Sequence, residues 1–360
     1  GGTDMTQAIE IIKPQVRRLR AYTLSPHRAT VKINQNENPW KTPERIVQET
    51  ARRMTDRSWS RYPDFVPARL RECLARHAGW MPEGVLAGNG SNELIQALLM
   101  VTVGRGKRVL ISEPTFTLYR QVATVLDGEV TSVPLTGSLA YDAALLRRTI
   151  AESNPDVTII CSPNNPTGCV LPDDELRAIL NAANGLVVID EAYHEFAGHT
   201  VVPLLNEHQN LVVLRTFSKA MAMAGLRIGY LLAAPELARE IGKALLPYNL
   251  NVISQTAAEV AIELYESELR PLVKQITAER DRLFADLGQV GGLTPVESKA
   301  NFMLVRSRIE PRIVFTELLS RDILIRDVSS YPMLSEYFRV SVGTPDENDR
   351  LIHGLEEIFE

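Results

Sequence analysis

Five short stretches of the sequence carry side chains that could take part in catalysis, and each offers a different chemical group. They read GNGSNE (88–93), EPTF (113–116), SPNNPTG (162–168), DEAYHEF (190–196) and SKAMAMAGLRIGY (218–230). Together they supply a glycine-rich turn, an aromatic ring, an amide, a carboxylate with a phenol, and a lysine with an arginine. This set suits a ligand that has a flat ring, an anionic group and a carbon that can bond to an amine.

Lys219 and Asp190 are suited to the reactive part of such a ligand. The amine of Lys219 can form an imine with a carbonyl compound, provided that its pKa is lowered. Asp190 ends an apolar run, and a carboxylate buried at a strand end requires a cationic partner. Tyr193 lies three residues later and can reach a neighbouring oxygen, while Phe116 can stack on a flat ring.

The anionic part of the ligand is predicted to be a phosphate. Residues 88–92 precede a helix pattern, so their backbone N–H groups can bind an anion. Arg227 can add charge-assisted hydrogen bonds and Ser218 can add a hydroxyl. Pyridoxal 5′-phosphate uses all of these groups: its aldehyde takes the lysine, its ring nitrogen pairs with an aspartate, and its phosphate needs the turn and the arginine. Each stretch alone is compatible with an ordinary turn, but their joint order favours a cofactor site.

The residues between these stretches predict the scaffold that positions them. Short, continuous apolar runs bounded by turn residues are typical of strands buried on both faces of a mostly parallel sheet. These runs are RVLIS (108–112), VTIIC (157–161), LVVID (186–190) and LVVLRT (211–216). Helix patterns at 93–102, 116–126 and 172–184 alternate with them. This alternation predicts an α/β fold, in which ligands bind beyond the carboxyl ends of the strands.

The pattern changes after about residue 255 and predicts a second unit. A long amphipathic helical region is interrupted at Pro271, and NFMLVR, PRIVFTELLSRD, ILIRD and YFRVSVG follow. TVKINQ, near the N-terminus, is expected to join this smaller α+β unit. We therefore expect an N-terminal arm and part of the small domain at 1–50, a large cofactor-binding domain at 51–265 and a small C-terminal domain at 266–360, so that both chain ends form the small domain.

Composition excludes several other functions. The formal net charge is -5 and no block of basic residues occurs, which argues against a nucleic-acid partner. No apolar run approaches the length of a membrane span. The three cysteines and six histidines show no metal-binding spacing, so no metal is expected. An odd number of cysteines and the absence of an apolar signal core in GGTDMTQAIE favour free thiols in the cytoplasm.

The five stretches, in this order and over nearly the whole chain, resemble those of fold-type I pyridoxal-phosphate-dependent aminotransferases of class I and II. The resemblance implies that Lys219 forms the Schiff base with the cofactor and that Asp190 pairs with its ring nitrogen. Asn165 and Tyr193 would contact its phenolic oxygen, and Phe116 would stack on the ring where many relatives have Tyr. The implied phosphate site comprises Gly90, Ser91, the backbone of Asn92, Ser218 and Arg227. The family is typically homodimeric, and the resemblance implies that Tyr62, in SRYPD, reaches the phosphate of the other subunit.

Finer features resemble the histidinol-phosphate aminotransferase subgroup. NQNENPW (34–40) is similar to its N-terminal segment and suggests Asn38 as a substrate contact. ILIRDVSSYPMLSEYFRVSVGT is similar to its C-terminal pattern. By this resemblance Arg339 would hold the substrate α-carboxylate in a bidentate manner, while Arg326 and Tyr22 would meet the substrate phosphate.

The resemblance predicts a ping-pong transamination in histidine biosynthesis, in which L-histidinol phosphate and 2-oxoglutarate give imidazole acetol phosphate and L-glutamate. Because histidinol phosphate has no α-carboxylate, Arg339 must serve glutamate, and the phosphate must use the same or an adjacent anion site. Three alternatives stay open at this point. They are an aminotransferase for aromatic amino acids, a pyridoxal-phosphate-dependent decarboxylase of a phosphorylated amino acid, and a non-enzymatic binding protein that retains the fold.

Overall fold

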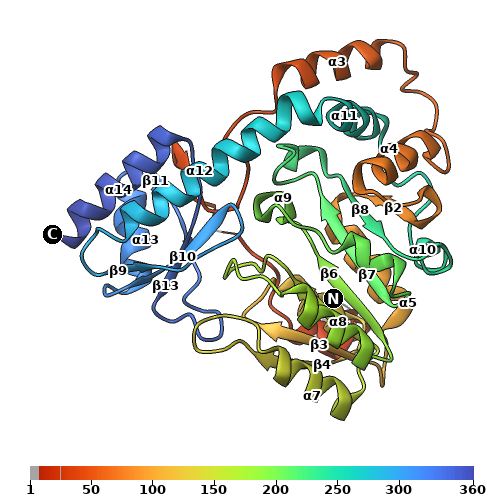
Figure 1. Cartoon of the computed structure of the whole chain (residues 1–360), viewed down its shortest axis with the longest axis horizontal. Coiled ribbons are helices and arrows are strands. Elements are labelled where there is room, and N and C mark those ends of the chain that lie inside the picture. Colours follow the sequence, from red (N-terminus) through yellow and green to blue (C-terminus); the bar gives the residue numbers. More distant parts are fainter. Residues whose placement is uncertain (1–7, 25) are drawn as a thin grey trace, which may run out of the picture.

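The computed structural model describes residues 8–24 and 26–360 of the chain. A seven-stranded sheet lies in the larger part of the molecule, and a smaller part beside it contains the C-terminal strands and helices (Figure 1). None of the helices in the described residues is long and apolar enough to cross a membrane.

The large sheet has the strand order β2-β8-β7-β6-β5-β3-β4. Strands β3 to β7 run parallel to one another, whereas β8 is antiparallel to both of its neighbours. The predicted apolar runs are confirmed as strands. The bounds are β2 (Val85–Gly88), β3 (Arg108–Glu113), β4 (Glu129–Pro134), β5 (Val157–Cys161), β6 (Leu186–Asp190), β7 (Leu211–Thr216) and β8 (Gly229–Leu232).

Helices cover both faces of this sheet. Successive side chains of a strand point to opposite faces, and the strands are apolar at successive positions, so both faces must be buried. In β6, Val187 and Ile189 pack against one set of helices, whereas Val188 packs against the other. The first set is α4 (Ala68–Ala78), α7 (Ala143–Ser153), α8 (Asp173–Ala182) and α11 (Val252–Glu263). The second set is α5 (Gly90–Thr102), α6 (Leu118–Val125) and α10 (Pro235–Gly242). The predicted α/β architecture is therefore present.

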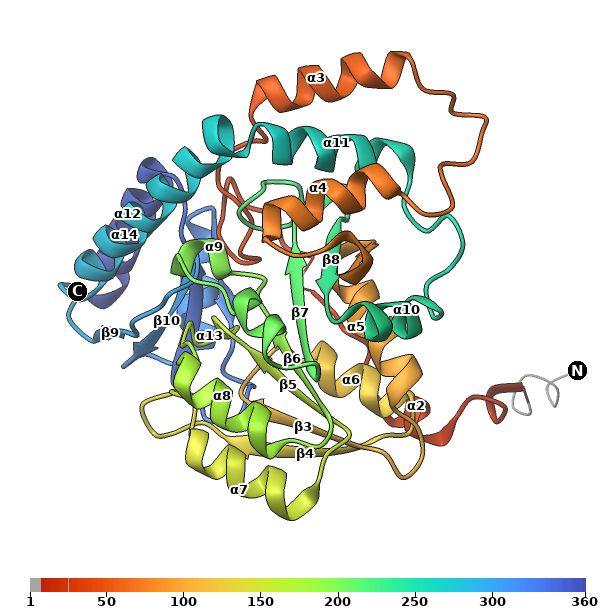
Figure 2. The same ribbon diagram turned by 45° about the vertical axis from the view of Figure 1, so that its right-hand side comes forward.

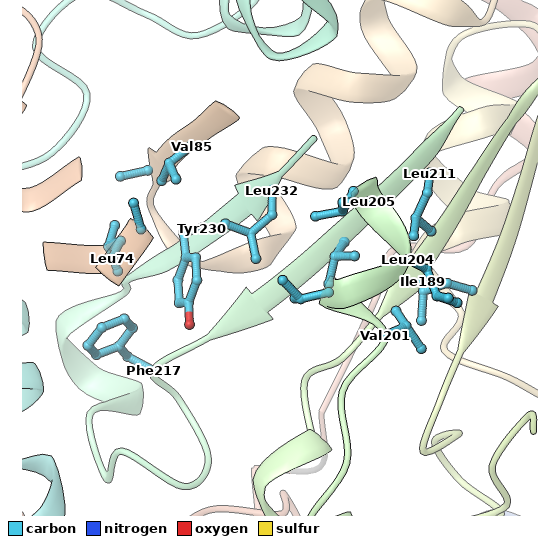
Figure 3. Packing of buried hydrophobic residues seen from close by; sticks show 14 of the residues in the cluster. Leu74, Val85, Ile189, Val201, Leu204, Leu205, Leu211, Phe217, Tyr230 and Leu232 are labelled. Atoms are coloured by element: carbon cyan, nitrogen blue, oxygen red, sulfur yellow. The ribbon is translucent and has the colours of Figure 1, made fainter. Parts of the chain in front are cut away.

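The first of these clusters includes the side chains at the β7–β8 end of the sheet, as Figure 3 shows. Tyr230, Leu232 and Phe217 lie there beside Leu74 of α4, and Tyr230 is only 2% exposed. Its hydroxyl accepts a hydrogen bond from the buried Arg215 of β7 at 3.2 Å. The sheet thus buries an ion-pairing residue close to the strand end that leads to Lys219.

The smaller part combines both ends of the chain. Strand β1 (Val31–Lys32) pairs in parallel with β11 (Ile323–Leu324), and a second sheet has the order β12-β13-β10-β9. The stretch ILIRD is thus divided between two sheets, because Ile325 separates β11 from β12. The bounds are β9 (Leu293–Pro295), β10 (Phe302–Ser307), β12 (Arg326–Asp327), β13 (Tyr337–Ser341), α13 (Pro311–Ser320) and α14 (Pro345–Phe359).

A helical run connects the two parts. Helix α11 is followed by a π-helical turn at Tyr265–Leu269 and then by α12 (Arg270–Leu287), which extends across to the C-terminal sheet (Figure 2). Pro271 occupies the start of α12, where a missing N–H costs nothing. The remaining helices are α2 (Pro14–Arg18), α3 (Glu44–Thr55) and α9 (His194–Ala197), and α3 lies against the outer side of α11. The domain boundaries at 50 and 265 stay a prediction.

Candidate active site

A cavity of about 440 Å³ opens where the carboxyl ends of β5, β6 and β7 meet the N-terminal segment and the small sheet. Most of the residues that the sequence singled out line this one cavity. They are Tyr22, Ser91, Asn92, Phe116, Asn165, Asp190, Tyr193, Ser218, Lys219, Arg227, Arg326 and Arg339.

Lys219 lies directly after β7, and its amine is poised for chemistry. Its Nζ donates a hydrogen bond to the backbone oxygen of Gln35 at 3.0 Å. Burial, assisted by the positive charges of Arg339 and Arg227, lowers the pKa of Lys219 from 10.5 to about 8. Near neutral pH a far larger fraction of this amine is therefore neutral than at the ordinary pKa of 10.5, which favours its action as a nucleophile or base.

Asp190 is a carboxylate buried at the end of β6, with 3% of its surface exposed. Its Oδ2 accepts a hydrogen bond from the Tyr119 hydroxyl at 2.5 Å, and its Oδ1 accepts one from the Ala192 backbone at 3.1 Å. Burial raises the pKa of Asp190, while these two hydrogen bonds oppose the shift. No basic side chain forms a salt bridge with it in the part of the chain that is described. A cationic group that enters the cavity would form an ion pair with this carboxylate.

The glycine-rich turn and Arg227 form the opposite wall. Helix α5 begins at Gly90, whose φ of +75° favours glycine, and an added Cβ would lie 2.5 Å from Nη2 of Arg227 and push that side chain aside. Arg227 donates to the Ser218 hydroxyl at 3.0 Å. At Gly229 an added Cβ would lie 2.3 Å from the backbone nitrogen of Ser91. Glycine thus lets β8 and the helix start approach closely, which concentrates N–H donors and a guanidinium at one point.

Two arginines line the side of the cavity nearest the small sheet. Arg339 is 6% exposed and donates to Asn165 Oδ1 at 2.6 Å and to the Asn34 backbone oxygen at 2.8 Å. Its Nε has no partner among the described residues, although it is buried. Arg326 is the register partner of Arg339 across β12 and β13. The unpaired donor and the second cation make this side suitable for an anion.

Three predicted residues do not line the cavity with their side chains. Gly90 has none and contributes its backbone conformation. Tyr62 is 80% exposed and stacks on Tyr248 with ring centroids 4.5 Å apart. Asn38 donates to the Ala220 backbone oxygen at 3.3 Å and accepts from the Trp40 N–H at 3.0 Å, so its side chain stabilises the local turn. The roles suggested for Tyr62 and Asn38 stay predictions.

The sequence interpretation missed three residues of the site. Tyr119, in the first turn of α6, follows Phe116 by three residues, and the two rings pack edge to face with centroids 5.5 Å apart. Asn36 belongs to the same NQNENPW segment as Asn38, but it is the one whose side chain reaches Tyr193, at 3.1 Å. Tyr331 lines the cavity near the arginines, and nothing in its flanking sequence distinguishes it.

Comparisons with known proteins show the family of the chain. The sequence model of the family described as aminotransferase class I and II matches residues 28–355. A histidinol-phosphate aminotransferase of Chlorobium phaeobacteroides is 38% identical over 348 residues, which cover 96% of each chain. Histidinol-phosphate aminotransferase 1 of Carboxydothermus hydrogenoformans is 39% identical and covers 91% of this chain and 93% of its own.

A solved structure agrees over almost the whole length of the chain. It is the histidinol-phosphate aminotransferase of Sinorhizobium meliloti in complex with pyridoxal 5′-phosphate, and it superposes with a TM-score of 0.86 at 25% identity. The match covers 96% of this chain and 97% of the other.

Proposed function

Because the chain belongs to the class I and II aminotransferase family, we propose that it transfers the amino group of L-histidinol phosphate to 2-oxoglutarate with the help of pyridoxal 5′-phosphate. The products would be imidazole acetol phosphate and L-glutamate, which places the enzyme in histidine biosynthesis. The observation that carries the proposal is the convergence of Lys219, Asp190 and the two arginines in one cavity.

The residues present fit this cofactor. Its aldehyde carbon accepts and releases an amino group, and its protonated ring withdraws electrons from the bonds at that carbon. Asp190 is buried without a cation, which matches the ring nitrogen. Ser91, Ser218 and Arg227 line the cavity beside the start of α5, and this set of hydroxyls, N–H groups and a guanidinium matches the phosphate. Lys219, with its lowered pKa, matches the aldehyde.

Each wall of the cavity then has a distinct task. Gly90, Ser91, Asn92, Ser218 and Arg227 would bind the phosphate, since they bring together a helix start, hydroxyls and a guanidinium. Phe116 would hold the plane of the ring. The amide oxygen of Asn165 already accepts from Arg339, so its NH₂ group is the part that can donate to the phenolic oxygen, beside Tyr193.

Lys219 is also the base of the reaction. Once its amine is free, Nζ can take the proton from the substrate carbon that bears the amino group. Nζ would then deliver this proton to the cofactor carbon that carried the aldehyde. A pKa of about 8 suits this role, because the amine can both accept and release a proton near neutral pH. The carboxylate of Asp190 would keep the ring nitrogen of the cofactor protonated while this proton moves.

The two arginines account for two anionic substrates. Arg339 would hold the α-carboxylate of glutamate through the Nη hydrogens that Asn165 and Asn34 leave free. Arg326, with Tyr22 at the same end of the cavity, would hold the phosphate of histidinol phosphate. One cavity can thereby receive both substrates in turn.

A spectroscopic experiment and a substrate assay test this function. The protein mixed with pyridoxal 5′-phosphate should develop a visible absorbance band that L-glutamate bleaches, and Lys219→Ala should not develop it. Histidinol phosphate, phenylalanine and threonine phosphate are then compared as substrates at equal concentration. Amino transfer from histidinol phosphate with the highest kcat/KM supports the proposal, whereas a lack of any band with the wild type contradicts it.

We further propose that the enzyme is a homodimer in which Tyr62 reaches the phosphate site of the other subunit. Helices α3 and α11 border an apolar groove of about 540 Å³ that includes Val47 and Ile253. Exposed aromatic residues continue this surface: Trp59 is 75% exposed and Phe65 is 66% exposed. An apolar area of this kind favours association, and Tyr62, which is 80% exposed, does not line the cavity of its own chain.

Trp59→Glu tests the homodimer. The wild type should sediment as a dimer and the variant should shift towards monomer at the same concentration. Tyr62→Phe should weaken cofactor binding without changing the sedimentation. A monomeric wild type with full activity would exclude this arrangement.

We propose the cytoplasm as the location, since all three cysteines are free thiols.

A further inference from the structure

Three consecutive residues, Asn34, Gln35 and Asn36, each hold one functional side chain of the cavity. The Asn34 backbone oxygen accepts from Arg339 at 2.8 Å, and the Gln35 backbone oxygen accepts from Lys219 at 3.0 Å. The Asn36 side chain contacts the Tyr193 hydroxyl at 3.1 Å. Of these three contacts, only that of Asn36 is made by a side chain, so it is the one that the residue type determines.

Asn36 is held more firmly than an ordinary loop residue. It is 1% exposed, and its φ is +58°, a left-handed conformation that asparagine tolerates better than most residues. Its backbone N–H donates to the Ser341 hydroxyl at 2.8 Å, and its backbone oxygen accepts from the Asn301 side chain at 2.9 Å. The small sheet therefore fixes where this side chain lies.

Ser341 also determines which end of the Asn36 amide faces Tyr193. The backbone N–H of Asn36 can only donate, so the Ser341 oxygen accepts there and its own hydrogen is free for Asn36 Oδ1, 2.9 Å away. The reversed amide would leave the Ser341 hydroxyl hydrogen without an acceptor among the described residues, although Ser341 is only 2% exposed. Oδ1 therefore faces Ser341, and the NH₂ group faces Tyr193.

The direction of this bond decides what Tyr193 can do. A hydroxyl that accepts from an NH₂ group keeps its own hydrogen for another partner. Burial raises the pKa of Tyr193, so the hydroxyl stays protonated at any working pH. No acceptor for its hydrogen occurs among the described residues, and Tyr193 lines the cavity. The hydrogen is thus available to a ligand there.

We infer that Asn36, oriented by Ser341, is a positioning residue that obliges the Tyr193 hydroxyl to donate its hydrogen bond into the cavity. This inference rests on the proposed function, in which the acceptor is the phenolic oxygen of the cofactor. A donor to that oxygen stabilises its negative charge. The oxygen then attracts the proton on the neighbouring Lys219 nitrogen less strongly, so the pKa of that nitrogen falls. Asn36 accordingly tunes the pH at which the bound cofactor titrates, without touching the cofactor.

Asn36→Asp is the decisive substitution, because it keeps the shape and removes the NH₂ donor. Aspartate also tolerates a positive φ. The Tyr193 hydroxyl would then donate to the new carboxylate and would no longer donate into the cavity. The measurement is the pH midpoint of the visible absorbance of the cofactor-loaded protein. It should rise by about one unit, a tenfold change in proton affinity.

A double-mutant cycle separates this effect from that of the added charge. Tyr193→Phe alone should raise the midpoint. If Asn36 acts through the hydroxyl, Asn36→Asp should produce a clearly smaller further shift in the Tyr193→Phe background than in the wild type. Equal shifts in both backgrounds would mean that charge alone is responsible, and the inference would be overturned.

Ser341→Ala provides a test without any change of charge. It removes the group that orients the amide, so the midpoint should rise in the same direction but by less. A midpoint equal to that of the wild type in a folded, cofactor-loaded Ser341→Ala protein would contradict the orienting role. If the wild type binds no cofactor, the proposed function itself fails. If the wild type titrates and the variants have the same midpoint, only the role of Asn36 is contradicted.

Discussion

Arg326 and Arg339 are direct partners across the antiparallel strands β12 and β13, and both line the cavity. Like charges directly opposite each other on a sheet are destabilising. Neither arginine forms a salt bridge with an acidic side chain among the described residues. A substrate anion would relieve this repulsion, so the pair favours binding of the anionic substrates over binding of neutral analogues.

The arginine pair should divide the two substrates between its members. Arg326→Ala should raise the KM for histidinol phosphate by roughly 10- to 100-fold, the effect of losing a charge-assisted hydrogen bond, and change the KM for 2-oxoglutarate little. Arg339→Ala should impair 2-oxoglutarate at least as strongly. Steady-state kinetics with each substrate varied in turn measure both effects. Histidinol without the phosphate is the control, since Arg326→Ala should leave its poor turnover unchanged.

Lys219→Met should stabilise the cofactor-free protein at pH 7. The pKa of about 8 in the folded state lies below the unfolded value near 10.5, so the unfolded chain binds more protons between these values. The lysine therefore costs stability below pH 8, and this cost disappears as the pH rises through 10.5. We expect a gain of about 3 kcal/mol at pH 7, since each pKa unit corresponds to about 1.4 kcal/mol, and this gain should vanish by about pH 10.5. Urea unfolding at both pH values measures it, and a gain independent of pH would contradict the explanation.

Arg215→Met should be strongly destabilising, although the residue lies outside the cavity. Arg215 is 3% exposed and bonds to Glu191 at 3.3 Å and to Thr200 at 2.8 Å. Its removal leaves the buried Glu191 without its cation, which costs about 3–5 kcal/mol. Thermal unfolding of the variant measures the loss. Adding Glu191→Gln should recover part of it, whereas breaking an exposed pair such as Arg306–Glu336 should change the stability little.

Tyr119→Phe should raise the pKa of Asp190 further. The Tyr119 hydroxyl donates to Oδ2 at 2.5 Å and opposes the rise in the Asp190 pKa that burial causes. Without this bond the carboxylate is harder to keep ionised, so the affinity for pyridoxal 5′-phosphate should fall by roughly 10-fold, in line with the loss of one hydrogen bond to a charged group. Fluorescence titration measures the affinity. Phe116→Leu serves for comparison, since it removes stacking and leaves Asp190 hydrogen-bonded.

The parallel core of the fold was predictable, because strands β3, β5, β6 and β7 are buried on both faces and read as continuous apolar runs. Strand β8 was not identified, since GYLL is only four residues long and its antiparallel direction leaves no mark in the sequence. The division of ILIRD at Ile325 was missed because its first half pairs with β1 near the other end of the chain, whereas its second half pairs with β13, the next strand along.

The site was predictable where side chains follow strand ends, as with Asp190 and Lys219. It was not predictable where a role depends on three-dimensional neighbours. Asn36 and Asn38 are equivalent by type, and the contact of the Asn36 amide with Tyr193 depends on Ser341 and Asn301, which are distant in sequence. Tyr119 resembled an ordinary core residue of α6, because its hydroxyl meets Asp190 from a distant part of the chain.

Arg339 joins the two sides of the cavity through Asn165 on one and Asn34 on the other. The same guanidinium is expected to grip the incoming carboxylate, so cohesion between the two sheets and affinity for the acceptor draw on a shared set of donors. A carboxylate that takes one of these N–H groups from Asn165 or Asn34 loosens the join, whereas one that binds the Nη hydrogens left free by those two residues does not. Selection for tight acceptor binding and selection for a rigid enzyme would consequently oppose each other at this single residue.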